Sequence, residues 1–316
     1  MAIDETAIQQ TLSLLLPSIQ AHRESALSGD GKRKLFVLGL SGVQGSGKST
    51  WARSLSQALN DGHHFKTVVL SLDDLYHTHE ELVRLRESNP GNSLFRNRGQ
   101  PGTHDEVLAQ QVFGKLRRGE EVALPRFDKG RFKGEGDRVP QSEWERVTAE
   151  PPVDILILEG WCVGFQSLSE DELEAKWSAA RTSALVESDA KGASTSMLRT
   201  HPLHNIRALN ENLRRYNATF LGPDHFDFLV HLDTERLANV YRWRIQQEEA
   251  LRAAKGEGQT NDEVIAFVQV YMPAYELYLE RLQREAFARN KGATGRKTQI
   301  RIKLGDIRQV ASVTEL

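Results

Sequence analysis

Short apolar runs alternate along the chain with longer segments whose apolar residues recur every three or four positions. The first pattern predicts strands and the second predicts amphipathic helices. The predicted strands cover residues 34–40, 67–72, 153–158, 226–232 and 298–304. The predicted helices cover residues 8–27, 48–59, 78–85, 103–116, 171–185, 205–216, 234–254 and 262–288, the last of them bent or interrupted near Pro273. This alternation predicts an α/β fold with a mostly parallel sheet flanked by helices.

The length of 316 residues suits one large domain, and we expect a single domain over 1–316. Residues 1–30 are assigned to an N-terminal helix, which Pro17 can kink. Residues 186–202 are small, polar and aperiodic, which predicts a flexible insertion.

One glycine-rich stretch between a predicted strand and a predicted helix, GVQGSGKS, fits the pattern G-x-x-x-x-G-K-[ST] at every fixed position. Glycines let such a loop turn its N–H groups toward an anion, and the helix behind it adds its positive end. We expect Lys48 to act on the β- and γ-phosphates of a nucleotide and the Ser49 hydroxyl to hold Mg²⁺. The expected nucleotide contacts are Gly42, Val43, Gln44, Gly45, Ser46, Gly47, Lys48, Ser49 and Thr50.

Acidic residues follow two further predicted strands, and ligands in parallel sheets bind beyond the carboxyl ends of strands. Glu159 ends the strand 153–158 and stands where a carboxylate would hold Mg²⁺ or its water; the alternative is an acid that caps the next turn. Asp73 is the candidate base for an acceptor hydroxyl, or it shares the metal. Asp74 is the alternative base, or it caps the following helix.

The acceptor side of the site is predicted from two basic stretches. In the loop before the helix 103–116, Arg98 and His104 are candidates to hold an anionic or hydroxylated acceptor. The alternative for that loop is a surface turn in which Thr103 or Asp105 caps the helix. A second set is either a solvated face or an acceptor clamp, and it consists of Lys129, Arg131, Lys133 and Arg138. Without further context, Arg242 and Arg244 are charges on a helix surface.

Composition narrows the class of protein. The net charge of −2 gives no argument for a nucleic-acid or membrane partner, and no apolar run approaches membrane-spanning length. The single cysteine, Cys162, excludes an internal disulfide and favours a reducing compartment, so we expect a cytoplasmic protein. The sequence has no His/Cys pattern of a zinc site.

These motifs resemble the P-loop kinases of the phosphoribulokinase, uridine kinase and pantothenate kinase group, and more closely the D-glycerate 3-kinase family of plants and fungi. The resemblance rests on seven segments in family order: SLDDLYHT, RNRGQPGTHD, PRFDKGRFKGEGDR, LEGWCVGF, NENLRRY, VYRWRIQQE and FVQVYMPAYELYL. It implies a P-loop NTPase fold with a helical insertion and lid. One departure is Phe127, where the wider group often has Tyr.

The resemblance also implies phosphorylation of a small hydroxy acid, D-glycerate, by MgATP to give 3-phosphoglycerate. It makes Asp73 the base, Glu159 the metal partner, and Arg242 and Arg244 catalytic lid arginines. The implied acceptor contacts are Asp73, Tyr76, Arg98, Thr103, His104, Asp105, Lys129 and Arg138. One rival is a kinase of the same fold for a nucleoside or another metabolite, and a nucleoside predicts an aromatic slot of Tyr76, Phe95 and Trp161. Another is a non-catalytic ATP-binding protein that would tolerate Asp73→Asn.

Overall fold

The structure, a computed structural model, describes residues 4–28, 34–184, 188, 192–256, 258–284, 286–287 and 297–316. Within those ranges, the central sheet has six strands in the order β10-β9-β8-β1-β7-β2, and every pair except β9–β10 is parallel. The strands are β1 (Phe36–Gly42), β2 (Thr67–Ser71), β7 (Ile155–Gly160), β8 (Phe228–Thr234), β9 (Thr298–Leu304) and β10 (Val310–Glu315). The predicted α/β fold with a mostly parallel sheet is therefore confirmed.

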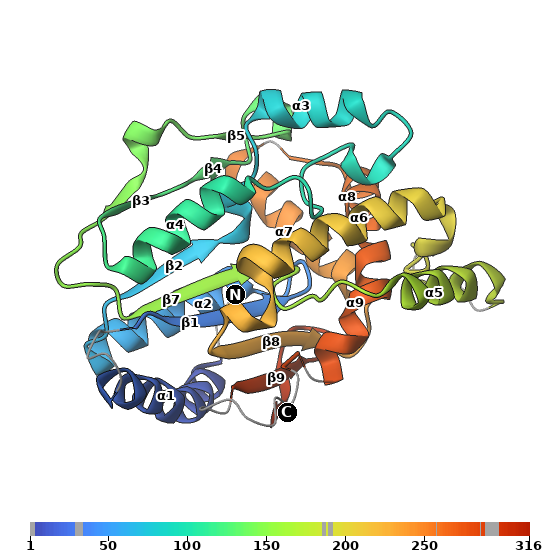
Figure 1. The fold of residues 1–316 in the computed structure, drawn as a ribbon. Helices are drawn as coiled ribbons and strands as arrows, with labels where there is room; N and C mark the ends of the chain where they lie inside the picture. Colours follow the sequence, from blue (N-terminus) through green and yellow to red (C-terminus); the bar gives the residue numbers. More distant parts are fainter. Residues whose placement is uncertain are drawn as a thin grey trace.

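Helices cover both faces of this sheet, with α4 and α6 over one face and α2 over the other (Figure 1). The helices are α1 (Glu5–Ser28), α2 (Lys48–Gln57), α3 (His79–Ser88), α4 (Glu106–Arg118), α5 (Glu170–Thr182), α6 (Leu203–Tyr216), α7 (Asn239–Lys255), α8 (Asn261–Gln269) and α9 (Met272–Arg284). Strands β1, β7 and β8 are buried along their whole length, as expected for parallel strands packed on both sides.

The predicted interruption of the segment 262–288 near Pro273 is confirmed, because a turn at Val270 and Tyr271 separates α8 from α9. Other predicted boundaries are wrong. The helix α7 begins at Asn239 rather than at residue 234, since β8 extends to Thr234. The sequence patterns also missed β10 and two short ladders, β3 (Val122–Leu124) with β6 (Glu145–Val147) and β4 (Phe127–Asp128) with β5 (Asp137–Arg138).

The predicted insertion 186–202 lies partly outside the described residues. Of its described part, Ser188 pairs with Ser194 in an isolated bridge, and a 3-10 turn at Leu198–Thr200 leads into α6. A single domain over 1–316 remains our proposal for the domain organisation. None of the helices in the described ranges is both long and apolar enough to cross a membrane.

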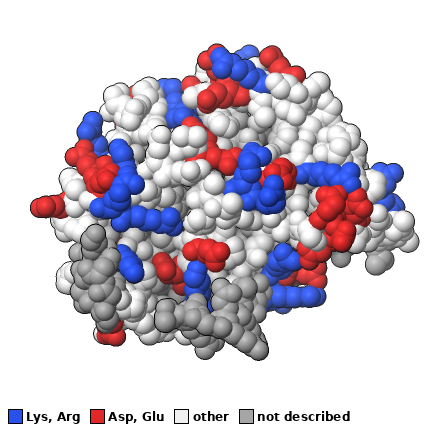
Figure 2. Space-filling view, viewed as in Figure 1, with Lys and Arg blue, Asp and Glu red and all other residues white. Residues whose placement is uncertain are grey.

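Acidic and basic side chains are interspersed over the face of the molecule seen in Figure 2. This pattern agrees with the small net charge of −2.

The strand register brings the predicted functional groups to one edge of the sheet. Glu159 pairs with Leu40 of β1 on one side and with Ser71 of β2 on the other. The glycine loop follows β1 directly, and Asp73 lies two residues after Ser71. The carboxyl ends of β1, β2 and β7 thus meet at one site.

Candidate active site

The glycine loop forms a tight turn between β1 and α2. Gly45 and Gly47 have φ of 80° and 94°, in the left-handed region that favours glycine. A Cβ on Gly45 would lie 2.6 Å from the Cβ of Trp243 in α7. The loop therefore requires glycine at position 45 both for its backbone conformation and for its contact with α7.

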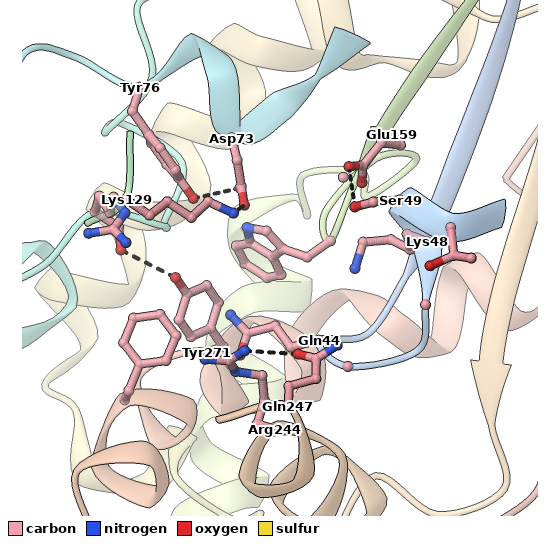
Figure 3. A pocket seen from close by; sticks show the side chains of 17 residues that line it. Gln44, Lys48, Ser49, Asp73, Tyr76, Lys129, Glu159, Arg244, Gln247 and Tyr271 are labelled. Atoms are coloured by element: carbon pink, nitrogen blue, oxygen red, sulfur yellow. Dashed lines mark hydrogen bonds and ion pairs between the residues drawn. The ribbon is translucent and has the colours of Figure 1, made fainter. Parts of the chain in front are cut away.

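The lysine and serine of the loop face Glu159. The Ser49 hydroxyl donates a hydrogen bond to Glu159 Oε1 at 2.8 Å, and the Lys48 ammonium donates to the carbonyl of Val43 at 3.2 Å. Burial lowers the pKa of Lys48, while the charges of Glu159 and Asp73 oppose that shift. This cluster joins the ends of β1, β7 and α2, as Figure 3 shows.

Ser49 and Glu159 together fit a magnesium ion. Their side-chain oxygens are the hard donors that Mg²⁺ takes, and Mg²⁺ in kinases binds through one or two protein groups plus substrate phosphates. No cluster of three or more His, Cys, Asp and Glu side chains suited to a metal occurs in the described ranges. Nucleotide phosphates would complete the coordination of an ion held through Ser49 and Glu159.

Asp73 lies opposite the glycine loop and accepts two side-chain hydrogen bonds. The Tyr76 hydroxyl donates to its Oδ1 at 2.8 Å, and the Lys129 ammonium donates to its Oδ2 at 2.5 Å (Figure 3). Burial alone would raise the pKa of Asp73, but the charge and hydrogen bond of Lys129 and the hydrogen bond from Tyr76 hold it well below its usual range. Asp73 is therefore ionised and held in a fixed orientation.

Asp74 has a different role from the one predicted. Its carboxylate accepts the backbone N–H of Phe127 at 3.0 Å, which fixes the start of the β4–β5 hairpin. The prediction that Asp74 caps the following helix is wrong, because Thr78 caps α3 in a capping box with Glu81. Burial, aided by the charge of Asp73 and opposed by the hydrogen bond from the Phe127 N–H, raises the pKa of Asp74 to about 6.

The glycine loop, Asp73 and Glu159 line one cavity of about 250 Å³, and Asp74 does not line it. The predicted site residues that line it are Gln44, Gly45, Gly47, Lys48, Ser49, Thr50, Asp73, Tyr76, Arg98, Lys129, Glu159 and Arg244. Three predicted ATP contacts, Gly42, Val43 and Ser46, belong to the loop but do not line the cavity. Sequence analysis missed Gln247, Phe267 and Tyr271, which α7, α8 and the α8–α9 junction contribute.

Four predicted acceptor contacts lie behind the wall of the cavity. Asp105 caps α4 by accepting the Leu108 N–H at 2.9 Å, which confirms the alternative interpretation of its role, and it also pairs with Arg138 at 3.0 Å. The Thr103 hydroxyl is bonded within its own loop, to the Gly99 N–H and the carbonyl of Gln100.

His104 is the fourth of these residues. Its ring stacks on Tyr76 with centroids 4.4 Å apart. Burial lowers the pKa of His104 to about 3, so the ring is neutral near pH 7 and cannot attract an anion as a cation would. The expectation of direct acceptor contacts at these four positions is therefore replaced by a supporting role, in which His104 and Arg138 fix Tyr76.

The two predicted lid arginines of α7, Arg242 and Arg244, lie in different environments. Arg244 lines the cavity, packs over the Phe267 ring with its guanidinium carbon 5.8 Å from the centroid, and has a buried Nε without a hydrogen-bond partner. Arg242 instead contacts Asp306, with 3.5 Å between Nη2 and the carboxylate, and does not line the cavity. The expected catalytic role therefore remains a proposal for Arg244 only.

Arg308, in the turn between β9 and β10, is a further residue that the sequence did not indicate. Its guanidinium donates to the carbonyls of Gly45 and Trp243, at 2.6 and 2.9 Å, and to Gln246 Oε1 at 2.7 Å. It also packs over the Trp243 ring at 5.2 Å. Arg308 thus joins the glycine loop to α7 at Trp243, the residue that precedes Arg244.

The geometry can be compared with known proteins. No model of a known protein family matches the chain. The chain is 35% identical over 277 residues to the uncharacterized kinase mug58 of Schizosaccharomyces pombe, covering 87% of this chain and 91% of that protein. It is 31% identical to the chloroplastic D-glycerate 3-kinase of Arabidopsis thaliana over 84% of this chain, and it spans about half, 52%, of that longer protein.

A solved structure agrees with these relatives. The D-glycerate 3-kinase of Cryptococcus neoformans superimposes with a TM-score of 0.81 at 30% identity, covering 98% of this chain and 99% of that one. Similarity at this level extends over the whole fold as well as the glycine loop. The chain belongs to the D-glycerate 3-kinase family of P-loop kinases.

Proposed function

We propose that this kinase transfers the γ-phosphoryl group of MgATP to D-glycerate and forms 3-phosphoglycerate. The observation that carries the proposal is the position of Asp73, which faces Lys48 across a single cavity beside Lys129 and Arg98. Names of relatives support the acceptor, and the cations of the cavity suit its carboxylate. A reducing compartment such as the cytoplasm is our proposal for its location.

The reaction follows from the positions of these side chains. Asp73 takes the proton of the acceptor hydroxyl while the hydroxyl oxygen attacks the γ-phosphorus. The bond from the γ-phosphorus to the bridging oxygen breaks, and ADP leaves. Lys48 and Arg244 carry positive charge toward the transferring group, where negative charge spreads in the transition state. Bound Mg²⁺, held through Ser49 and Glu159, would neutralise phosphate charge.

The residues that line the cavity bear on both alternatives for the acceptor, an anion and a nucleoside. Two of the three cations expected for an acidic acceptor, Arg98 and Lys129, line it. Of the aromatic residues expected to form a base slot, Phe95 does not line the cavity, and the indole N–H of Trp161 donates to the carbonyl of Gly99 at 3.1 Å. Two of the three aromatic groups thus line the cavity, as do two of the three cations, and the choice of an acidic acceptor rests on the names of the relatives.

Coupled ADP release tests the proposal, with MgATP and a panel of D-glycerate, L-glycerate, uridine, pantothenate and ribulose 5-phosphate. We expect turnover with D-glycerate and its loss in Lys48→Ala and Asp73→Asn. The exposed acid Asp171 in α5 offers a matched control, because Asp171→Asn makes the same chemical change on the surface. Turnover with another acceptor would contradict the substrate, and a functional Asp73→Asn protein would contradict the catalytic role.

A further inference from the structure

Both carboxylate oxygens of the proposed base already have hydrogen-bond donors. Tyr76 donates to Oδ1 and Lys129 to Oδ2. Figure 3 shows the two side chains converging on Asp73 from one side of the cavity. A carboxylate that receives hydrogen bonds and faces an ammonium has a reduced affinity for a further proton. In this arrangement Asp73 is oriented for catalysis but is a poor base.

We propose that Lys129 is a gate on Asp73, which keeps the base inactive until an anionic group of the acceptor draws the ammonium away. This inference rests on the proposed function and adds regulation of the same site. The acceptor then supplies both the hydroxyl that reacts and the charge that releases its base. Neutral alcohols would bind beside a base that Lys129 still holds.

The ion pair is placed where an acceptor can displace it. The Lys129 side chain is 56% exposed and that of Asp73 is 30% exposed, so water screens their attraction. The Lys129 ammonium stands at the end of a flexible four-carbon stem. Because Asp74 holds the backbone N–H of Phe127, the ammonium can move while the hairpin that carries it stays in place.

A second cation, Arg98, can bind the carboxylate of the acceptor together with Lys129. Arg98 lines the same cavity, and its guanidinium donates to the backbone carbonyls of Gly134 and Glu135. These partners are neutral, so they leave the charge of Arg98 available to a carboxylate. An acceptor carboxylate beside Arg98 and Lys129 would therefore compete with Asp73 for the ammonium.

The gate also suppresses hydrolysis of ATP in the absence of acceptor. For hydrolysis, a water oxygen attacks the γ-phosphorus, its proton passes to Asp73, and the bond to the bridging oxygen breaks to give ADP and phosphate. When Lys129 occupies Asp73, the base contributes little to this step. Removing Lys129 should therefore increase hydrolysis, even though it removes a positive charge from the cavity.

Acceptor-free ATP hydrolysis is the direct test. We expect Lys129→Met to raise the rate roughly tenfold, part of the 10²–10⁴ that a general base can supply. Lys129→Arg can still pair with Asp73, so its rate should rise less than that of Lys129→Met. The double variant Lys129→Met with Asp73→Asn should return to the wild-type rate or below. A Lys129→Met rate equal to or below that of the wild type would overturn the gate.

D-lactate provides a second arm that uses the unmodified protein. It has the carboxylate and 2-hydroxyl of D-glycerate but lacks the 3-hydroxyl, so it can move Lys129 without accepting phosphate. We expect D-lactate to stimulate hydrolysis by the wild type several-fold, to leave Lys129→Met unchanged, and to bind that variant more weakly in calorimetry. Glycerol, which is neutral, should stimulate neither.

The proposed substrate and the proposed gate can be refuted separately, because each predicts a different pair of results. Lack of turnover with D-glycerate, together with increased hydrolysis in Lys129→Met, would contradict the proposed substrate and retain the gate. Turnover with D-glycerate, together with no stimulation by D-lactate and no increase in Lys129→Met, would retain the substrate and overturn the gate.

Discussion

The substitution Asp74→Asn should stabilise the protein near neutral pH while preserving catalysis. The Asp74 carboxylate is partly buried between Asp73 and the hairpin and accepts the N–H of Phe127 at 3.0 Å. An asparagine Oδ1 can accept the same hydrogen bond and carries no charge. The substitution therefore removes the cost of burying a charge next to that of Asp73 and keeps the contact with the hairpin.

The magnitude follows from the pKa. Burial raises the pKa of Asp74 from 3.8 to about 6, so the folded protein binds this proton more tightly than the unfolded chain does. The stability that this carboxyl contributes is thus present below about pH 4 and is lost as the pH rises to about 6. A shift of roughly two units corresponds to at most about 3 kcal/mol, and solvent screening reduces our expectation to about 1–2 kcal/mol.

Urea unfolding at several values between about pH 4 and about pH 7.5 measures this effect. We expect Asp74→Asn to exceed the wild type by about 1–2 kcal/mol above pH 6 and by little near pH 4. The control Asp171→Asn should stay within about 0.5 kcal/mol throughout. A difference that does not change with pH, or a loss of stability near neutral pH, would refute the reasoning. Loss of ADP release in Asp74→Asn, with Asp73→Asn active, would exchange the roles of the two acids.

Three further substitutions test single contacts of the site. Gly45→Ala places a Cβ against α7 at a left-handed φ. We therefore expect a loss of at least about 2 kcal/mol in the free energy of urea unfolding and no measurable ATP binding in calorimetry. The control Gly62→Ala, whose new Cβ meets no neighbouring atom, should retain ATP binding. Arg308→Met removes three hydrogen bonds and should cost about 2 kcal/mol of unfolding free energy and weaken ATP binding; unchanged ATP affinity would argue against its positioning role. Tyr76→Phe removes a donor that lowers the pKa of Asp73, so the acid limb of the kcat/KM profile should move to higher pH.

The parts of the site that follow strands were predictable from the sequence. A strand, a glycine loop and a helix have local signatures, and the rule for parallel sheets places Asp73 and Glu159 near the loop. The register of β1, β2 and β7 confirms that these strand ends align. Local pattern was sufficient here because Lys48 and Ser49 belong to a continuous motif, Glu159 lies in β7, and Asp73 lies two residues after β2.

The cavity wall formed by α7, α8 and the C-terminal turn was not predictable in the same way. Arg308 is separated by 263 residues from Gly45, whose carbonyl it binds, and no local pattern marks it. Arg242 and Arg244 lie two apart on one helix, and the sequence does not say which of them faces the cavity. The helix rotation is decided by packing of Trp243, which is fully buried between them.

The predicted acceptor contacts in the loop before α4 and in β5 show a related difficulty. A basic and polar composition predicts ligand contact, yet His104 and Arg138 are used to hold Tyr76, through ring stacking and through a 2.7 Å hydrogen bond to its carbonyl. The sequence contains the residue types needed for binding and for support, and only the packing decides between them. Asp105 was the exception, because a helix cap has its own local pattern.

The helices α7 and α8 contact both halves of the cavity, which gives these distant residues a common role. Trp243 of α7 packs on the glycine loop at Gly45, and Arg308 reinforces that contact. At the α8–α9 junction, the Tyr271 hydroxyl donates to the carbonyl of Arg98 at 3.2 Å. Arg244 of α7 also packs on α8. The glycine loop and the loop that carries Arg98 therefore contact the same unit of packed helices. The distance between Lys48 and Asp73, on which phosphoryl transfer depends, is therefore set by helix packing as well as by the sheet.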